Sequence, residues 1–176
     1  MNKGINIFGN MTETAVMKEL QKIHDMNTYK PMDASMLIYQ DIKDALASLL
    51  FITEKRNGDI KAIKVAVGSR QRTYDVYDKR NVSSLTVNNE NVFYTGVIDT
   101  YEHKDLAMLN IENSFLHDEN DEYVLILLRG KLSELLVKMD PKFYQKYVIT
   151  SKQGVPILYV KLTKVLYGIL RRAMMF

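Results

Sequence analysis

The segment with the clearest bearing on chemistry is D-L-A-M-L-N-I-E-N-S-F-L-H, residues 105–117. Its apolar run, residues 106–109, ends directly at Asn110. In many metal-dependent enzymes a buried strand ends at a carboxylate, because a hard cation such as Mg²⁺ prefers charged oxygen ligands. Asn110 instead offers a neutral amide with a single acceptor oxygen. The segment therefore has the pattern of a metal-binding strand end without the charge that holds the metal.

Other catalytic and metal-binding patterns are absent from the sequence. It contains no G-x-x-x-x-G-K-[ST] or G-x-G-x-x-G phosphate loop and no G-x-S-x-G nucleophile turn. The three histidines, His24, His103 and His117, are scattered without metal-ligand spacing. The acidic run at residues 118–122 lacks the spacing and the glycine of a calcium loop. The absence of cysteine excludes disulfides and thiolate zinc sites.

Basic residues gather in two stretches of a chain whose formal net charge is only +3. The first stretch covers residues 61–80 and the second covers residues 161–172. A cluster of Lys and Arg is a common footprint of nucleic-acid binding, although the same pattern also suits an ordinary solvated face. The candidate nucleic-acid-binding cations are Lys61, Lys64, Arg70, Arg72, Arg171 and Arg172.

Two local patterns predict the elements that would position the first basic stretch. Residues 13–26 predict an amphipathic helix, with Val16, Leu20 and Ile23 on one face. Residues 51–67 predict a β-hairpin, because two extended runs flank R-N-G-D and Gly58 suits a turn with positive φ. Basic and apolar residues alternate on both faces of its second strand, which is typical of a protruding arm or an edge hairpin.

The remaining segments predict a mixture of helices and strands, and therefore an α+β fold for these 176 residues. Residues 91–101 suit either a strand or a buried helix. We expect short strands at 105–111, 122–128 and 155–162, a helix at 131–139 and a final helix over 163–176. No apolar run approaches the roughly 20 residues of a membrane span, and the N-terminal residues lack the apolar core of a secretory signal. We therefore expect an intracellular protein of the cytoplasm or nucleus.

Five segments carry a pattern of longer range. They are A-V-M-K-E-L-Q-K-I-H-D-M-N-T-Y (15–29), F-I-T-E-K-R-N-G-D-I-K-A-I-K-V-A-V-G (51–68), Y-D-K-R-N-V-S-S-L-T-V (77–87), N-I-E-N-S-F-L-H-D-E-N-D-E-Y-V (110–124) and L-T-K-V-L-Y-G-I-L-R-R (162–172). In this order they resemble the reverse transcriptase of copia-type retrotransposons. That family has an A-M-x-x-E-L helix, a D-G hairpin followed by K-A-R-L-V-A-x-G, a Y-D-x-x-x-S-P segment, D-V-x-N-A-F-L-H and L-Y-G-L-K-Q-S.

The resemblance implies a right-hand polymerase, of which this chain has the fingers and an incomplete palm with a mostly antiparallel sheet and packed helices. It places a fingers-like region at residues 1–95 and a partial palm-like region at 96–176. The implied activity is templated addition of deoxynucleotides with Mg²⁺. The implied metal-binding groups are the side chain at Asn110 and the backbone carbonyl of Ile111. Phe115 and the basic residues named above are the implied contacts to the nucleotide and to an RNA or an RNA–DNA hybrid.

Departures from the family pattern alter the expected function. Asn110 stands where the family has its first metal aspartate, and the Y-V-D-D segment with the other two aspartates does not occur in these 176 residues. Ile63 and Lys64 replace the R-L of K-A-R-L-V-A, whereas Lys61 matches the family lysine. We therefore expect a reverse-transcriptase-like domain that is inactive on its own and binds no Mg²⁺.

Two other functions remain open from the sequence. The chain could be a non-enzymatic nucleic-acid-binding module that uses the basic residues. It could also be a protein-interaction or assembly domain derived from a retroelement, because an incomplete palm would expose apolar surface and open sheet edges. In that case we expect self-association or pairing with a separate chain that supplies the missing palm segment, and no membrane partner.

Overall fold

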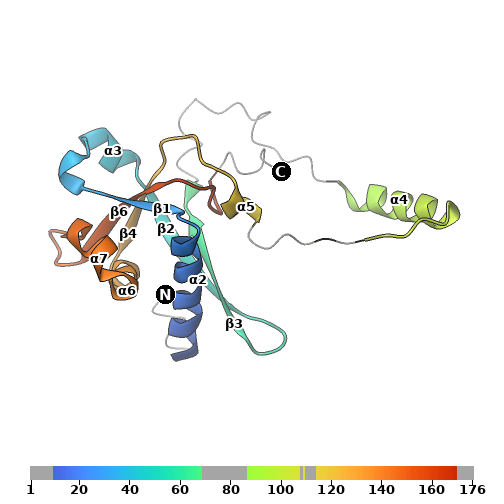
Figure 1. Ribbon diagram of the computed structural model, residues 1–176, viewed down its shortest axis with the longest axis horizontal. Helices are drawn as coiled ribbons and strands as arrows, with labels where there is room; N and C mark the ends of the chain where they lie inside the picture. The colour runs from blue at the N-terminus through green and yellow to red at the C-terminus, as the bar shows by residue number, and fades with distance from the viewer. Residues whose placement is uncertain (1–9, 69–86, 108, 110–113, 170–176) are drawn as a thin grey trace.

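A computed structural model describes residues 10–68, 87–107, 109 and 114–169 of the chain (Figure 1). Within these ranges the chain alternates between helices and strands, as predicted for an α+β protein. The elements in chain order are α2 (Asn10–Asp25), β1 (Tyr29–Met32), the 3₁₀ turn η1 (Ala34–Met36), α3 (Tyr39–Asp44), β2 (Leu46–Glu54), β3 (Ile60–Ala66), α4 (Asn89–Tyr101), α5 (Ser114–His117), β4 (Leu125–Arg129), α6 (Lys131–Met139), α7 (Pro141–Tyr144), the 3₁₀ turn η4 (Gln145–Tyr147), β5 (Ile149–Thr150) and β6 (Pro156–Leu162).

One mixed sheet forms the centre of the molecule. Its strand order is β1-β6-β4-β2-β3, and β5 adds to β6 beyond this path. Only the β2–β4 pair is parallel, so the sheet is mostly antiparallel, as expected. Residues 1–95 contribute β1, β2 and β3, and residues 96–176 contribute β4, β5 and β6, so the two predicted regions share this sheet.

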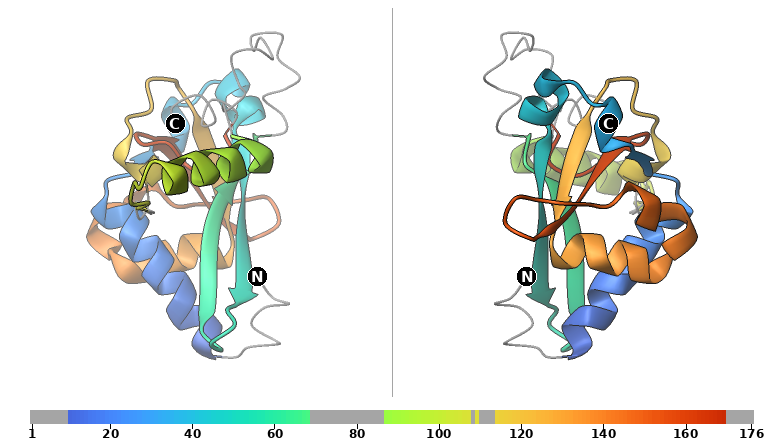
Figure 2. Two further views of the ribbon diagram at one scale, coloured as in Figure 1. Left: turned by 90° about the vertical axis from the view of Figure 1, so that its right-hand side faces the viewer. Right: turned by 90° about the vertical axis from the view of Figure 1, so that its left-hand side faces the viewer.

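The inner face of the sheet carries the main hydrophobic core. The amphipathic helix α2 lies on it with Val16, Leu20 and Ile23 fully buried, which confirms the predicted helix and its apolar face. From the sheet, Ile126 and Leu158 point into the same core, and α6 and α7 cover its other end (Figure 2). Because side chains alternate along a strand, the residues between them face the opposite side.

Among the described residues, the cover on the outer face of the sheet lies over its centre. Leu125, Ile157 and Tyr159 form a smaller buried cluster beneath the segment of η1 and α3. This cover does not extend over the β2–β3 hairpin, where Leu49 and Phe51 are exposed. The hairpin therefore has one packed face and one open face.

Two glycines shape the hairpin. Gly58 has φ +82 in the turn between β2 and β3, as the R-N-G-D pattern predicts. Gly168 has φ +95 where the chain crosses the end of β3, and a Cβ on it would lie 2.0 Å from the Ala66 carbonyl oxygen. The Tyr167 carbonyl accepts a 2.7 Å hydrogen bond from the Ala66 amide beside it. The L-Y-G segment therefore packs directly against the backbone of β3, through this hydrogen bond and the close contact at Gly168.

Helix α4 differs from the prediction for residues 91–101. This segment is a helix, but it is exposed along its whole length rather than buried, and it projects from the body of the molecule (Figure 1). The Asn88 side chain caps it by accepting a 2.8 Å hydrogen bond from the Asn91 amide. Capping therefore supports a helix that has no cover from the rest of the described chain.

Two other expected elements are not found. Among residues 105–111, those the structure describes (105–107 and 109) form no strand, and Leu106 and Leu109 are exposed. Residues 163–169 form turns and a single bridge rather than the start of a helix, because Gly168 needs a left-handed backbone next to Ala66. The hairpin and the strands at 122–128 and 155–162 are confirmed within a few residues, and the helix at 131–139 is confirmed at both ends. Within the described residues, no helix is long and apolar enough to cross a membrane.

Candidate functional site

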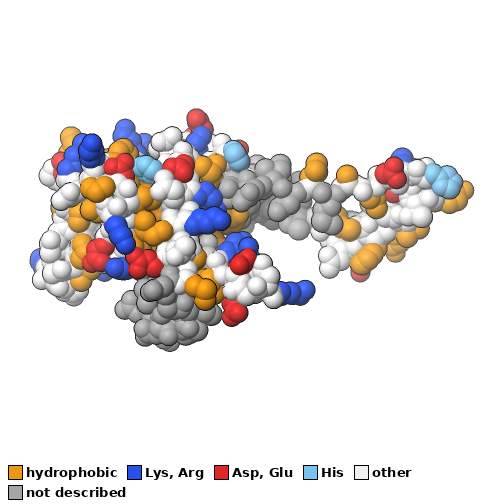
Figure 3. Space-filling view, turned by 60° about the horizontal axis from the view of Figure 1, so that its bottom comes forward, with side chains coloured by type: hydrophobic (Ala, Val, Ile, Leu, Met, Phe, Trp, Pro, Cys, Tyr) orange, Lys and Arg blue, Asp and Glu red, His pale blue; other side chains and the backbone are white. Residues whose placement is uncertain are grey.

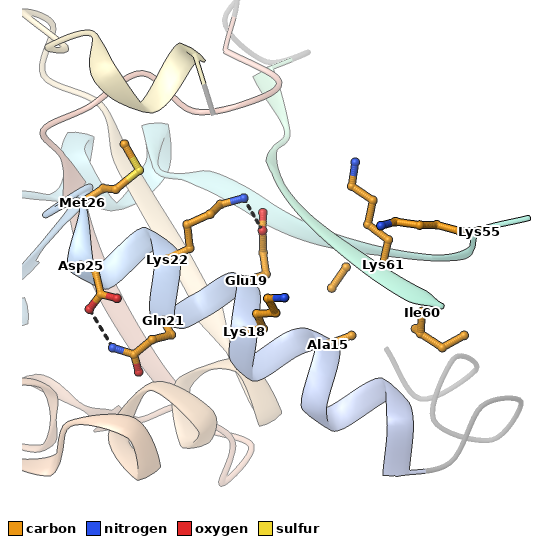
Figure 4. Close-up of a pocket in the computed structure, with 11 residues that line it drawn as sticks. Ala15, Lys18, Glu19, Gln21, Lys22, Asp25, Met26, Lys55, Ile60 and Lys61 are labelled. Atoms are coloured by element: carbon orange, nitrogen blue, oxygen red, sulfur yellow. Dashed lines mark hydrogen bonds and ion pairs between the residues drawn. The ribbon is translucent and has the colours of Figure 1, made fainter. Parts of the chain in front are cut away.

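A groove of about 640 Å³ runs between α2 and the β2–β3 hairpin. Figure 4 shows its walls, with α2 on one side and the hairpin on the other. Four of the lining residues are lysines and two are acids. The charged lining residues are Lys18, Glu19, Lys22 and Asp25 from α2, and Lys55 and Lys61 from the hairpin.

The fold dictates why these lysines face the groove. Val16 and Leu20 bury one side of α2 in the core, so Lys18 and Lys22 lie on its polar side. On β3, Ala62 faces inward, so the neighbouring Lys61 is left exposed at the groove wall. Lys55 follows β2 in the turn that joins the two strands. The amphipathic pattern of a helix and that of a strand therefore combine to place cations on both walls.

The groove keeps an excess of positive charge after its internal ion pairs are counted. Lys22 pairs with Glu19 at 2.8 Å, and Asp25 accepts a 2.8 Å hydrogen bond from the Gln21 amide (Figure 4). Within the described ranges, the ammonium groups of Lys18, Lys55 and Lys61 have no ion pair or hydrogen bond, and all three residues are exposed. Three free cations over a concave surface are suited to successive phosphates of a polyanion.

Lys64 does not belong to this surface. It is fully buried on the inner face of the hairpin, and its Nζ donates a 2.8 Å hydrogen bond to Ser48 Oγ. Burial lowers the pKa of Lys64 to about 7, because a charged ammonium loses its hydration there. Its backbone amide donates to Glu19 Oε1 at 3.2 Å, which links β3 to α2. The expectation that Lys64 contacts a nucleic acid is therefore corrected to a role inside the packed face.

Most other predicted site residues lie outside the described ranges. These are Arg70, Arg72, Asn110, Ile111, Arg171 and Arg172. Phe115 lies in the short helix α5, and its side chain is also outside the description. Of the predicted contacts, the structure therefore places Lys61 at the groove.

Sequence reasoning missed Lys18, Lys22 and Lys55 as candidate ligands. The helical pattern of residues 13–26 places Lys18 and Lys22 off the apolar face but gives them no ligand. They become candidates only because the polar side of α2 faces a hairpin that carries its own lysines. This arrangement is a tertiary contact and is not visible in the local sequence pattern. A search for runs of basic residues overlooks cations that come from two elements about 40 residues apart in the chain.

The acidic turn at 118–122 is tied to the sheet. Glu119 pairs with Lys164 at 3.6 Å, and the Asn120 side-chain amide donates to the carbonyls of Glu122 and Leu162 at 2.7 and 3.3 Å. Within the described residues, no group of three or more His, Asp or Glu side chains is arranged to hold a metal ion. The turn thus has a structural use in these contacts.

A second polar cluster joins α2 to α7 beside the core. His24 Nδ1 lies 3.0 Å from the Tyr144 hydroxyl, and His24 Nε2 lies 3.8 Å from Asp140 Oδ2. Burial raises the pKa of Tyr144 to about 12, with a smaller contribution from Asp140. The Tyr144 phenol therefore stays protonated at neutral pH and acts as a hydrogen-bonding group rather than as a base.

Comparisons of this chain with models of known protein families, with curated proteins and with solved structures found no match.

Proposed function

We propose that this chain is a reverse-transcriptase-like domain that binds the phosphate backbone of RNA or of an RNA–DNA hybrid without catalysing nucleotide addition. The observation that carries the proposal is the groove between α2 and the hairpin, where exposed Lys18, Lys55 and Lys61 have no ion-pair partner among the described residues. Support for the family comes from the five ordered sequence segments. Two of them, residues 15–29 and 51–68, supply the two walls of this groove.

The chemistry of the groove favours a backbone contact over recognition of particular bases. Lysine is a compact point charge on a flexible stem, so it pairs with phosphate without fixing a base edge. The apolar lining at Ala15, Ile60 and Ala62 offers no hydrogen-bond donors or acceptors for base readout from its side chains. We therefore expect binding with little sequence preference and a steep dependence on salt.

Absence of catalysis follows in this proposal from Asn110, which replaces the carboxylate that the family uses for Mg²⁺. Removing a unit charge about 4 Å from a dication weakens binding by several kcal/mol at an effective dielectric constant near 20. The proposal also assigns the elements of the fold to the fingers and the palm of a polymerase. In it, the hairpin and α2 belong to the fingers, and β4 to β6 with α6 belong to the palm.

The test is fluorescence anisotropy of a labelled RNA–DNA hybrid and of a single-stranded RNA over a salt series, in Mg²⁺ and then in EDTA. The variant Lys18→Gln/Lys55→Gln/Lys61→Gln removes the free cations of the groove. We expect it to reduce the salt slope by about 2–3, since each of the three phosphate contacts contributes about 0.7–0.9. The matched control Lys30→Gln/Lys142→Gln/Lys152→Gln removes the same charge from exposed sites outside the groove and should leave most of the slope intact.

Each arm of this experiment has a defined contrary outcome. Equal losses in both triple variants would show that only net charge matters, and the groove would not be the site. Binding that requires Mg²⁺, or extension of a primer by the protein, would overturn the non-catalytic part of the proposal. Absence of binding at low salt would overturn the nucleic-acid assignment.

A further inference from the structure

Helix α4 presents an unusual amount of apolar surface to solvent. Its large apolar side chains are all exposed, from 54% for Ile98 to 85% for Tyr101. Phe93, Val97 and Tyr101 recur every four residues and therefore share one side of the helix, with Tyr94 and Ile98 beside them. Figure 3 shows hydrophobic side chains on this projecting segment. Exposed apolar surface of this extent usually marks an interaction site.

The outer face of the β2–β3 hairpin is a second exposed apolar surface. Leu49 lies opposite Val65, and Phe51 lies opposite Ile63, so these four side chains share one face. Leu49 is 48% exposed and Phe51 is 52% exposed. A cavity of about 440 Å³, lined by Ile42, Ala47, Val67 and Leu127 among others, adjoins this face at the base of the hairpin. The hairpin face and the cavity form one apolar strip.

The helix and the strip match in length and in charge. Thirteen helical residues span about 20 Å, and the β2 residues from Ala47 to Thr53 span about the same. Of the two acids of α4, Glu90 lies on the side of the helix that carries Phe93 and Val97, whereas Asp99 lies on the opposite side. The strip has Arg129 at its cavity end. Glu90 is therefore placed to pair with Arg129 when the apolar side of α4 lies on the strip.

The geometry points to a second copy of this chain as the occupant. In this structure α4 lies away from its own hairpin (Figure 1). Each chain carries both the helix and the strip, so a twofold axis would create two identical contacts at once. Aromatic side chains bury roughly 150–250 Å² each, so one contact buries on the order of 1,000 Å² in total. Two contacts bury about twice that, which reaches the range of stable dimers.

We propose that two copies of this chain form a symmetric dimer in which α4 of each copy lies on the outer face of the β2–β3 hairpin of the other. The contact would be formed by Phe93, Val97 and Tyr101 on one side and by Leu49 and Phe51 on the other. The inner face, with its lysine groove, stays open in this arrangement. The dimer therefore does not rest on the proposed nucleic-acid function.

The absence of cysteine from the chain allows a direct test by pairwise crosslinking. One preparation carries Val97→Cys and a second carries Leu49→Cys. On mild oxidation, the mixture should give a covalent dimer joining the two variants. The control mixture, Val97→Cys with Thr150→Cys, places the second thiol on exposed β5 instead and should give at least tenfold less of this product.

Packing of α4 on its own hairpin gives a distinguishable result. A single chain with both Val97→Cys and Leu49→Cys would then close an internal disulfide, and the mixed preparations would give no covalent dimer above control. Sedimentation velocity over a hundredfold range of protein concentration completes the test. We expect a monomer–dimer equilibrium that Phe93→Ser or Leu49→Asp weakens at least tenfold, whereas Leu106→Ser, also exposed, leaves it unchanged. A monomer at every concentration, or equal effects of all three substitutions, would overturn the proposal.

Discussion

On its inner face the β2–β3 hairpin packs against α2, whereas the outer face of the same two strands lies open. The inner face holds small residues such as Ala62 and Ala66, and even a buried lysine, Lys64. The outer face carries larger apolar side chains, Leu49 and Phe51, that remain about half exposed. Both faces carry large apolar side chains, since Leu50 and Ile52 pack on the inner face, and those of the outer face are the less buried.

This difference shows that burial depends on which element is available to cover a surface. Small side chains on the inner face allow α2 to approach β3 closely, and the lysine is accommodated because its Nζ reaches Ser48. Large side chains on the outer face are left exposed by the described residues, and the proposed dimer would cover them. The comparison can be tested by changing residues on one face and matched residues on the other or elsewhere in the chain.

The largest effect is expected where the L-Y-G segment closes the inner face. Gly168→Ala places a Cβ 2.0 Å from the Ala66 carbonyl oxygen and forces a left-handed backbone on alanine. Strain and overpacking together should reduce the free energy of unfolding by about 3–5 kcal/mol, measured by urea denaturation. The control Gly154→Ala has φ +75 but open space around its Cβ, and should cost about 1–2 kcal/mol. Equal costs would mean that the close approach to Ala66 does not exist.

The next largest effect is expected from a comparison of Leu20, on the helix that covers the inner face of the hairpin, with Leu49 on its outer face. Leu20→Ala removes a fully buried side chain of α2 from the inner core and should cost about 2–5 kcal/mol. Leu49→Ala on the outer face should cost less than about 1 kcal/mol when unfolding is followed at concentrations where the chain is monomeric. A large loss from Leu49→Ala in the monomer would show that something in the same chain already covers the outer face.

A smaller effect with a distinctive pH dependence is expected at Lys64. Burial lowers the pKa of its ammonium from 10.5 in the unfolded chain to about 7 in the folded protein. Between these two values the unfolded state binds one more proton, so stability rises with pH, by up to about 1.4 kcal/mol per unit. Below pH 7 both states are protonated, and the full penalty for burying the charge remains.

Lys64→Met keeps the aliphatic stem and removes the charge. We expect the variant to be more stable than the parent by about 1–3 kcal/mol at pH 7, because a buried charge without an ionic partner is unfavourable. The gain should shrink steadily as the pH is raised toward 10. Denaturation curves of both proteins across this range provide the measurement. A gain that does not change with pH would contradict the burial of a titrating ammonium.

Much of this fold was predictable because its strongest patterns are local. The apolar repeat of Val16, Leu20 and Ile23 determines α2, and Gly58 determines the hairpin turn. The final helix expected over 163–176 failed at 163–169 for a nonlocal reason. The spacing of Leu166 and Leu170 suits a helix, but Gly168 adopts a left-handed conformation to pass the end of β3. The local sequence pattern does not reveal the contact between Gly168 and the end of β3.

The candidate site was less predictable than the fold. Lys61 and Lys64 alternate on one strand with apolar neighbours on both faces, so their pattern did not show which lysine is exposed. The position of α2 decides this, because it covers the face that holds Lys64 and leaves Lys61 at the groove. Likewise, the apolar residues of 91–101 predicted burial, whereas they are exposed on α4.

The smallest effect compares two helix caps of the same kind in packed and exposed settings. Asp140 accepts a 3.0 Å hydrogen bond from the Phe143 amide at the start of α7, next to the buried Tyr144. Asn88 makes the equivalent bond to the Asn91 amide at the start of exposed α4. Asp140→Ala should lower the free energy of unfolding by about 1 kcal/mol, because α7 belongs to the core.

Asn88→Ala should weaken α4 by a similar amount locally, yet leave global unfolding of the monomer unchanged. The expected readout is a loss of helical circular dichroism before the main transition, with the midpoint of that transition in place. Amide hydrogen exchange would locate the loss at residues 89–101. If Asn88→Ala lowered the global midpoint as much as Asp140→Ala does, α4 would be part of the cooperative core. Its apolar side would then be packed within the monomer, and the contrast between the two faces of the hairpin would disappear.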